Sequence, residues 1–179
     1  MARDLGVHAN DSHPYIFISY NSGDADVVGK IITEIEKYGV NIWYDRGIEN
    51  GSKWEKEIAL HISEAEIVIF FVTKGVFSKE EPGVRKEYDI AKMNDKKKLL
   101  VMLDDFMDIP VEHQWWWSEM RHIQSIKTTD KTYIQIAESI LIECVNKARI
   151  TLNVELMKDT EGRVYLSDGL SYEEKQFKG

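Results

Sequence analysis

The sequence predicts an α/β protein with a mostly parallel sheet that helices cover on both faces. Segments such as residues 67–72 are apolar at every position, which is typical of strands buried on both sides. Stretches with helical spacing of apolar residues alternate with these strands along the chain. That alternation indicates parallel strands joined by crossover helices. The length of 179 residues fits one compact domain.

The first strand is expected at residues 15–20, where aromatic and β-branched side chains occupy both faces. Residues 21–24 form a turn that can cap a helix. Apolar residues then recur at helical spacing until Gly39 ends the run. Residues 40–44 predict the second strand, and the loop 45–51, which contains two glycines, follows it.

Capping boxes are expected to open the next two helices. Ser52 with Glu55 begins one helix, and Ser78 with Glu81 begins another. Between the two helices, residues 66–73 are the most strand-like segment of the chain. This part of the sequence therefore predicts helix, strand and helix in that order.

The second half of the domain closes the same pattern. Residues 98–103 predict a fourth strand, and 104–110 form a connection to the short aromatic segment 115–117. A fifth strand is expected near residues 123–126, followed by a long helix. The inner stripe of that helix comprises Ile134, Ala137, Ile140, Leu141, Cys144, Val145 and Ala148. Cys144 is therefore interpreted as core filler rather than as a nucleophile.

The domain is expected at residues 14–150. Beyond it, the apolar residues change from helical spacing to alternation with polar residues. Apolar and polar residues alternate on both sides of the turn 159–162, which indicates a hairpin within a C-terminal extension, residues 151–179. Residues 1–13 are polar and small without a period, and we expect a flexible lead-in.

Composition limits the partners and the compartment. The formal net charge of −8 disfavours a nucleic-acid partner. The single cysteine cannot form an internal disulfide, which fits a reducing interior and predicts a cytoplasmic protein. The longest apolar run is far shorter than the roughly 20 residues of a membrane helix, and the N-terminus lacks the apolar stretch of a signal peptide. We expect no membrane association.

Common cofactor and metal motifs are missing from the sequence. The segment 47–53 has the wrong spacing for a phosphate-binding P-loop, and no three-glycine fingerprint follows the first strand. The first and third strands lack the acidic ends of a receiver domain, and no Gly-x-Ser-x-Gly elbow occurs. The five histidines show no ligand spacing. We therefore expect neither a bound metal nor a resident cofactor.

A ligand site in such a sheet lies beyond the C-terminal ends of the strands, where the winding direction reverses. That edge carries the loops after Tyr20, Tyr44, Thr73 and Leu103. Any chemistry is expected there.

Three segments, taken together, resemble the TIR domain family and particularly its bacterial members. They are residues 15–20 with Asp24; Trp43, Tyr44 and Asp45 through Ile48, Gly51 and Trp54 to Ile58 and Ile62; and residues 66–73 followed by Ser78 and Glu87. The resemblance covers about residues 14–149, in the family's order and with its loop spacings. It implies a flavodoxin-like fold with a five-stranded, mostly parallel sheet.

The resemblance implies one of two functions. TIR domains are either assembly modules for signalling or enzymes that break down NAD⁺. The enzymes share a glutamate on the helix after the third strand, and Glu87 occupies the matching position. Where the family often has a tryptophan one turn earlier, this chain has Gly83 after Pro82, so the wall of the site differs there.

The chemistry explains why one carboxylate is enough. The nicotinamide of NAD⁺ leaves as a neutral ring, so its departure needs no proton donor, whereas ordinary glycosidases use two carboxylates. One anion can bind the ribose hydroxyls and stabilise the positive charge that develops on the sugar. Glu87 is the candidate for this catalytic role. NAD⁺ is the substrate, and no further cofactor is required.

Other residues at the edge are candidates for substrate binding. Backbone N–H groups of residues 22–24 are placed to receive a phosphate, and aromatic rings after the second strand are placed to stack on the substrate's flat rings. The loop that begins at Asp45 commonly reaches into a neighbouring subunit in TIR enzymes. The substrate-binding candidates are Ser19, Tyr20, Asp24, Trp43, Tyr44, Asp45 and Trp54.

The leading hypothesis is a TIR-type NAD⁺ nucleosidase that resembles the stand-alone enzymes of antiphage systems such as Thoeris. It would release nicotinamide and ADP-ribose, or a cyclic or transferred variant that a separate effector reads. Self-association through TIR–TIR contacts is expected. The alternative is a non-enzymatic TIR adaptor or effector that acts by TIR–TIR interaction alone.

Each candidate residue also has a structural interpretation. A glutamate in a charged helix such as the one containing Glu87 is often only solvated, and Trp54 falls on the core stripe of its helix. Ser19 and Asp24 are equally consistent with helix capping. The three tryptophans 115–117 cannot all point inward, so at least one is expected at a partner contact.

Overall fold

A five-stranded parallel sheet forms the centre of the protein, as the sequence predicts. The computed structural model describes residues 14–44, 52–105 and 108–167. The strands follow the order β2-β1-β3-β4-β5, and every neighbouring pair is parallel. They are β1 (Tyr15–Ser19), β2 (Asn41–Tyr44), β3 (Ile67–Val72), β4 (Lys97–Met102) and β5 (Ser125–Lys127).

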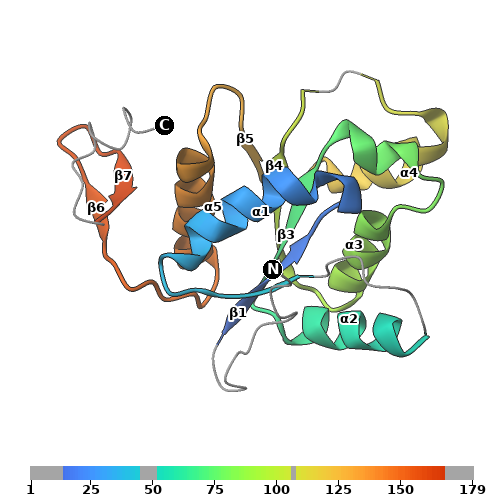
Figure 1. Ribbon diagram of the computed structural model, residues 1–179, viewed down its shortest axis with the longest axis horizontal. Coiled ribbons are helices and arrows are strands. Elements are labelled where there is room, and N and C mark those ends of the chain that lie inside the picture. Colours follow the sequence, from blue (N-terminus) through green and yellow to red (C-terminus); the bar gives the residue numbers. More distant parts are fainter. Residues whose placement is uncertain (1–13, 45–51, 106–107, 168–179) are drawn as a thin grey trace.

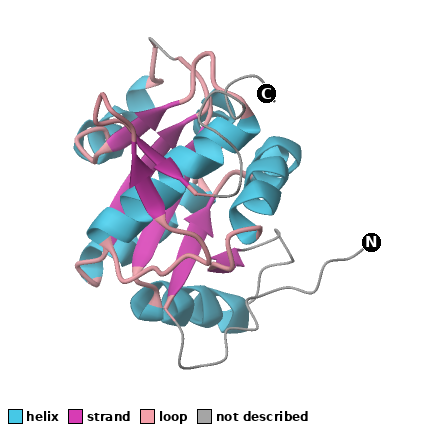
Figure 2. Ribbon diagram, turned by 90° about the vertical axis from the view of Figure 1, so that its left-hand side faces the viewer, coloured by secondary structure: helices cyan, strands magenta, loops and turns pink. Residues whose placement is uncertain are grey.

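Helices cover both faces of this sheet (Figures 1 and 2). One layer consists of α1 (Ala25–Glu36) and α5 (Tyr133–Lys147), which pack against each other. The opposite layer consists of α2 (Ser52–Glu64), α3 (Gly83–Met93) and α4 (Val111–Met120). Two short 3₁₀ turns, η1 (Ser22–Asp24) and η2 (Lys74–Ser78), follow β1 and β3. No helix in the described part of the chain has the length and apolarity needed to cross a membrane.

The alternation of side chains along β1 assigns each residue to one layer. Ile16 and Ile18 belong to the core beneath α1 and α5, whereas Tyr15 and Phe17 belong to the core beneath α2, α3 and α4. Successive side chains of a strand point to opposite faces, so Ser19 faces the same layer as Phe17. β1 lies between β2 and β3, which places the reversal of winding next to the end of β1.

The second expected capping box does not form. Ser78 ends η2, where its Oγ donates to the Gly75 carbonyl at 2.7 Å. Helix α3 begins only at Gly83, with Pro82 as its extended N-cap at φ −65° and ψ 136°. The hydroxyl is satisfied locally within the 3₁₀ turn, so it is not available to cap a later helix.

The region after β4 also differs from the expectation. The aromatic segment 115–117 lies inside a helix, α4. The fifth strand, β5, lies further toward the C-terminus than the expected residues 123–126. Apolar residues of α4 are spread around the helix instead of forming one stripe. The hydrophobic period that signals an amphipathic helix is therefore absent.

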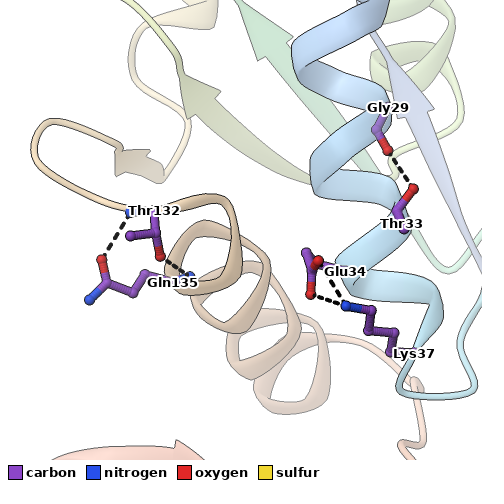
Figure 3. A network of polar contacts seen from close by, with 6 residues as sticks. All are labelled: Gly29, Thr33, Glu34, Lys37, Thr132 and Gln135. Atoms are coloured by element: carbon purple, nitrogen blue, oxygen red, sulfur yellow. Dashed lines mark hydrogen bonds and ion pairs between the residues drawn. The ribbon is translucent and has the colours of Figure 1, made fainter. Parts of the chain in front are cut away.

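A capping box that the sequence reading did not identify opens α5. The Thr132 hydroxyl accepts from the Gln135 N–H at 3.2 Å, and the Gln135 side chain accepts from the Thr132 N–H at 2.9 Å (Figure 3). The buried stripe of the helix includes Ile136, whereas Ile134 and Val145 are only partly buried. The expected stripe is thus correct in its centre and wrong at these positions.

Cys144 lies fully buried on this stripe, and burial raises the pKa of its thiol to about 12. Because the thiolate is the reactive form, we expect iodoacetamide to leave the folded protein unlabelled at mildly alkaline pH and to label it after denaturation. Mass spectrometry of the intact chain measures this. Labelling of the native protein at the rate of a free thiol would contradict the assignment of Cys144 to the core.

The expected C-terminal hairpin is present as β6 (Leu156–Lys158) and β7 (Val164–Leu166), which pair antiparallel beside α5 (Figure 1). The Leu166 side chain is fully buried in the core beneath α1 and α5. The Leu166 N–H donates to the Glu138 carboxylate at 3.2 Å. Upstream, the Asn153 N–H donates to the Tyr38 carbonyl at 3.0 Å. The hairpin is therefore fixed to the helical layer.

Candidate functional site

Glu87 is a buried carboxylate on a helix that otherwise turns apolar residues inward. Its exposed fraction is 9%, and Val84, Tyr88 and Ala91 form the buried face of α3 around it. Helix α3 contacts β1 and β3 and begins near the C-terminal edge of the sheet, because η2 alone separates it from the end of β3. A buried glutamate is rare and signals a specific role for the charge.

Ser19 ends β1 on the same face of the sheet. Its exposed fraction is 1%, and among the described residues its Oγ has no hydrogen-bond partner. The register places it opposite Phe70 of β3. A buried hydroxyl without a partner costs about 1–3 kcal/mol. The Ser19 Oγ is therefore an atom that water or a ligand could satisfy, and its role in binding stays a prediction.

Trp54 brings a second such atom to this face from α2. Its side chain is half-buried, and the indole Nε1 is buried with no acceptor among the described residues. The Trp54 and Trp43 rings lie 6.0 Å apart between centroids. Helix α2 packs against α3, so Trp54 and Glu87 come from neighbouring helices of one layer.

Trp43, in contrast, is part of the core. Its ring stacks on Phe17 at 5.0 Å and on His61 at 4.3 Å, and only 4% of the residue is exposed. This packing leaves little ring surface for a substrate. The Trp43 ring contacts the Trp54 ring and helps to position it. A direct role of Trp43 in substrate binding stays a prediction.

Tyr20 and Tyr44 lie on the other face of the sheet. Both are half-buried and pack against the core beneath α1 and α5, with their ring centroids 6.4 Å apart. The sheet therefore separates them from Glu87 and Ser19. The remaining binding candidate, Asp45, lies outside the described residues.

Asp24 ties together the two loops that border the site. The Thr73 hydroxyl donates to its carboxylate at 2.5 Å, which links η1 to the end of β3. The Asp24 N–H donates to the Asn21 carbonyl at 2.8 Å, so this expected phosphate ligand is already used within the turn. A Cβ on Gly75 would approach the side-chain amide nitrogen of Asn21 to 2.9 Å, so the Asn21 side chain would have to shift if Gly75 were replaced.

Thr73 and Gly75 were not predicted as site residues, although the loop after Thr73 was expected at this edge of the sheet. A threonine directly after the third strand is a usable signal, because parallel strands end at a common edge. Nothing in the sequence indicates the Asn21–Gly75 contact, which depends on how the two loops meet. Within the described residues, no group of three or more His, Cys, Asp or Glu side chains is arranged to hold a metal ion.

Comparison with known proteins agrees with the fold. The model of the TIR domain family matches residues 16–140. The crystal structure of the RPS4 and RRS1 TIR domain heterodimer superposes with a TM-score of 0.56 at 14% identity, over 76% of this chain and 99% of that one. No curated protein matches the sequence significantly.

Two further TIR domain structures are similar at lower scores. One is the TIR domain of the Toll-related receptor TRR-2 from Hydra magnipapillata, with a TM-score of 0.47 and 12% identity over 64% of this chain and 84% of that one. The other is the TIR domain of the activated Roq1 resistosome, with a TM-score of 0.43 and 15% identity over 70% of this chain and 84% of that one. The family match spans most of the sheet and its helices, and the chain belongs to the TIR domain family.

Proposed function

We propose that this protein is a TIR-type NAD⁺ nucleosidase with Glu87 as its catalytic residue. The observation that carries the proposal is the burial of the Glu87 carboxylate on α3, a helix that begins near the C-terminal edge of the sheet, where parallel folds bind ligands. The Ser19 hydroxyl and the Trp54 N–H, which have no hydrogen-bond partner within the described residues, face the same layer. Together they offer a charge, a hydroxyl and an aromatic N–H to a ribose and its attached ring.

The reaction breaks the bond between the nicotinamide nitrogen and ribose C1′. The bonding electron pair goes to the pyridinium nitrogen, so nicotinamide leaves neutral, and positive charge develops on C1′ and the ring oxygen. Glu87 stabilises this charge and orients the ribose hydroxyls. Water then adds to C1′ and loses a proton to solvent, giving ADP-ribose. A hydroxyl or a ring nitrogen of the same or another nucleotide takes the place of water in the cyclic or transferred product.

The proposed biological setting is cytoplasmic antiviral defence, in which the product is a nucleotide signal for a separate effector. Self-association of TIR domains completes the site in this proposal. The RPS4 and RRS1 structure is described as a TIR domain heterodimer, which supports a proposal that involves pairing of TIR domains. NAD⁺ turnover should therefore rise more steeply than in proportion to protein concentration.

The test is turnover of a fluorescent NAD⁺ analogue at several protein concentrations, with and without a crowding agent. Mass spectrometry of the products distinguishes linear, cyclic and transferred ADP-ribose. Release of nicotinamide that grows with protein concentration supports the proposal. No turnover under any of these conditions, by a sample that self-associates, contradicts it.

Ser19→Ala separates the binding role of Ser19 from a structural one. Because the Oγ is buried without a partner among the described residues, its removal should raise the free energy of unfolding by about 1 kcal/mol. The same change should lower turnover by roughly tenfold if the hydroxyl binds the ribose. Urea unfolding and the fluorescent assay measure the two effects. A less stable variant with full activity would assign Ser19 to the scaffold.

A non-enzymatic adaptor is the second candidate, and one surface favours it. Val111 and Trp115 lie one turn apart on α4 and are 78% and 61% exposed. Exposed aromatic and aliphatic side chains of this kind are common at protein contacts. An adaptor would show partner binding that Trp115→Ala weakens, together with no NAD⁺ turnover in the test above.

A further inference from the structure

A cavity of about 540 Å³ lies between α4 and strands β4 and β5. The cavity and Glu87 lie on the same face of the sheet. The cavity lies over the last two strands, β4 and β5, and β3 separates these strands from β1, which carries Ser19. None of Glu87, Ser19 and Trp54 lines it. The volume is in the range of small-molecule sites, about 300–1,000 Å³. The cavity is thus separate from the proposed NAD⁺ site.

The floor of the cavity is apolar and comes from the sheet and the inner side of α4. Leu100 and Trp117 are buried there, and Met102 and Ile109 are half-buried. The Gln114 amide donates to the Ile109 carbonyl at 3.0 Å, which fixes the loop before α4 against the helix. Ligand pockets are lined mainly by apolar and aromatic side chains, so a floor of this kind suits an apolar body.

The rim is polar and comes from two elements. Gln114, Ser118 and Arg121 follow one another at helical spacing and line the cavity from α4 and its C-cap. From β5, Lys127 pairs with Met102 in register and therefore shares its face. The side chains of Gln114, Ser118 and Arg121 extend to solvent instead of packing on the sheet, and the cavity between α4 and the sheet therefore stays open.

The charge of the rim is positive in an acidic protein. Arg121 and Lys127 both line the cavity, and no carboxylate of the described residues does. Within the described residues, neither side chain has an ion-pair or hydrogen-bond partner. The whole chain carries a formal net charge of −8. Two unpaired cations over an apolar floor select an anion with an apolar body.

We infer that this cavity is a binding site for a small aromatic organic anion, held by Arg121 and Lys127 at the rim and by Trp117 and Leu100 at the floor. The site is independent of the proposed catalytic function. Its ligand places a carboxylate, sulfonate or phosphate group between the two cations and a ring system against Trp117. The shared chemistry is a single anionic group on a flat apolar body.

The experiment compares three probes by NMR titration of the labelled full chain: 1-naphthoate, the uncharged 1-naphthalenemethanol and inorganic phosphate. We expect saturable shifts of the Ser125, Lys127 and Trp117 signals with 1-naphthoate. The alcohol and phosphate should bind at least about fivefold more weakly, because the alcohol lacks the anionic group and phosphate lacks the apolar ring system. Added salt should weaken 1-naphthoate binding.

Single variants test the rim. Arg121→Gln and Lys127→Gln should each weaken 1-naphthoate binding by about two- to fivefold, the range expected for an exposed charge. The matched control is Lys147→Gln on α5, which removes one exposed charge from the opposite layer and should change nothing. Ser118→Trp fills the cavity and should abolish binding, and circular dichroism checks that each variant folds.

Four results would overturn the inference: no saturable shift up to about 10 mM probe, shifts that map away from α4 and β5, equal affinity for the acid and the alcohol, or equal weakening of binding by Lys127→Gln and Lys147→Gln. Binding that Lys127→Gln and Lys147→Gln weaken equally would show only long-range attraction to positive charge. NAD⁺ turnover plays no part in these readouts, so the test stands whether or not the protein is an enzyme.

Discussion

Replacing Glu87 by Gln is expected to lower NAD⁺ turnover by at least about 10²- to 10³-fold, the usual effect of losing one preorganised group that stabilises transition-state charge. The amide has the same shape as the carboxylate but no negative charge to balance the developing sugar cation. The variant should fold, and its free energy of unfolding should equal or exceed that of the wild type, because an uncharged amide is cheaper to bury. Single-turnover nicotinamide release measures the effect.

The matched control for this substitution is Glu81→Gln. Glu81 precedes α3, is 70% exposed at its side chain and lies 3.7 Å from the Lys86 ammonium group. It has the same chemistry as Glu87 without the burial, so turnover should stay within about twofold of wild type. Undiminished nicotinamide release by the Glu87→Gln protein in a concentrated, assembled sample would refute the proposed role.

Trp116→Ala should give the largest loss of stability, about 3–5 kcal/mol in the free energy of unfolding. Trp116 is 1% exposed, its ring stacks on Phe77 at 5.4 Å, and its indole N–H donates to the His113 Nδ1 at 3.2 Å. The substitution empties a large volume where α4 meets η2 and leaves the buried His113 nitrogen without its donor. Chemical denaturation followed by circular dichroism measures the change.

The neighbouring Trp115→Ala is the control that the chain itself provides. Trp115 is 61% exposed, and its ring contacts the Arg85 guanidinium group at 4.3 Å from its centroid. An exposed cation–π pair is worth about 0.5–1 kcal/mol, so this variant should lose no more than that. Equal destabilisation by the two variants would mean that α4 packs in another orientation.

The sheet was predictable because its signal is local. Strand β3 and most of β1 are apolar at every position, and only a strand covered on both sides requires this. The start of α3 was not predictable from the capping pattern, because Ser78 satisfies its hydroxyl within η2. Helix α4 was not predicted because two of its apolar residues, Val111 and Trp115, are exposed, and the polar His113 occupies a buried position, so the apolar residues do not mark one face.

The location of the candidate site at the C-terminal edge of the sheet was predictable, but the positions of its individual side chains were not. Ser19 and Glu87 came from strand ends and family spacing, and the structure places both on one face of the sheet. The separation of Tyr20 and Tyr44 follows from strand alternation. The packing of Trp43 needs the pairing of Phe17 with Trp43 in neighbouring strands, and a single sequence does not contain that register.

The C-terminal hairpin sets where the folding unit ends. The family model stops at residue 140, yet Leu166 fills space in the hydrophobic interior beneath α1 and α5. A shortened protein that ends with α5 would expose to water the apolar side chains that Leu166 and its neighbours now cover. In this chain the last strand therefore completes the hydrophobic interior and belongs to the unit that folds together.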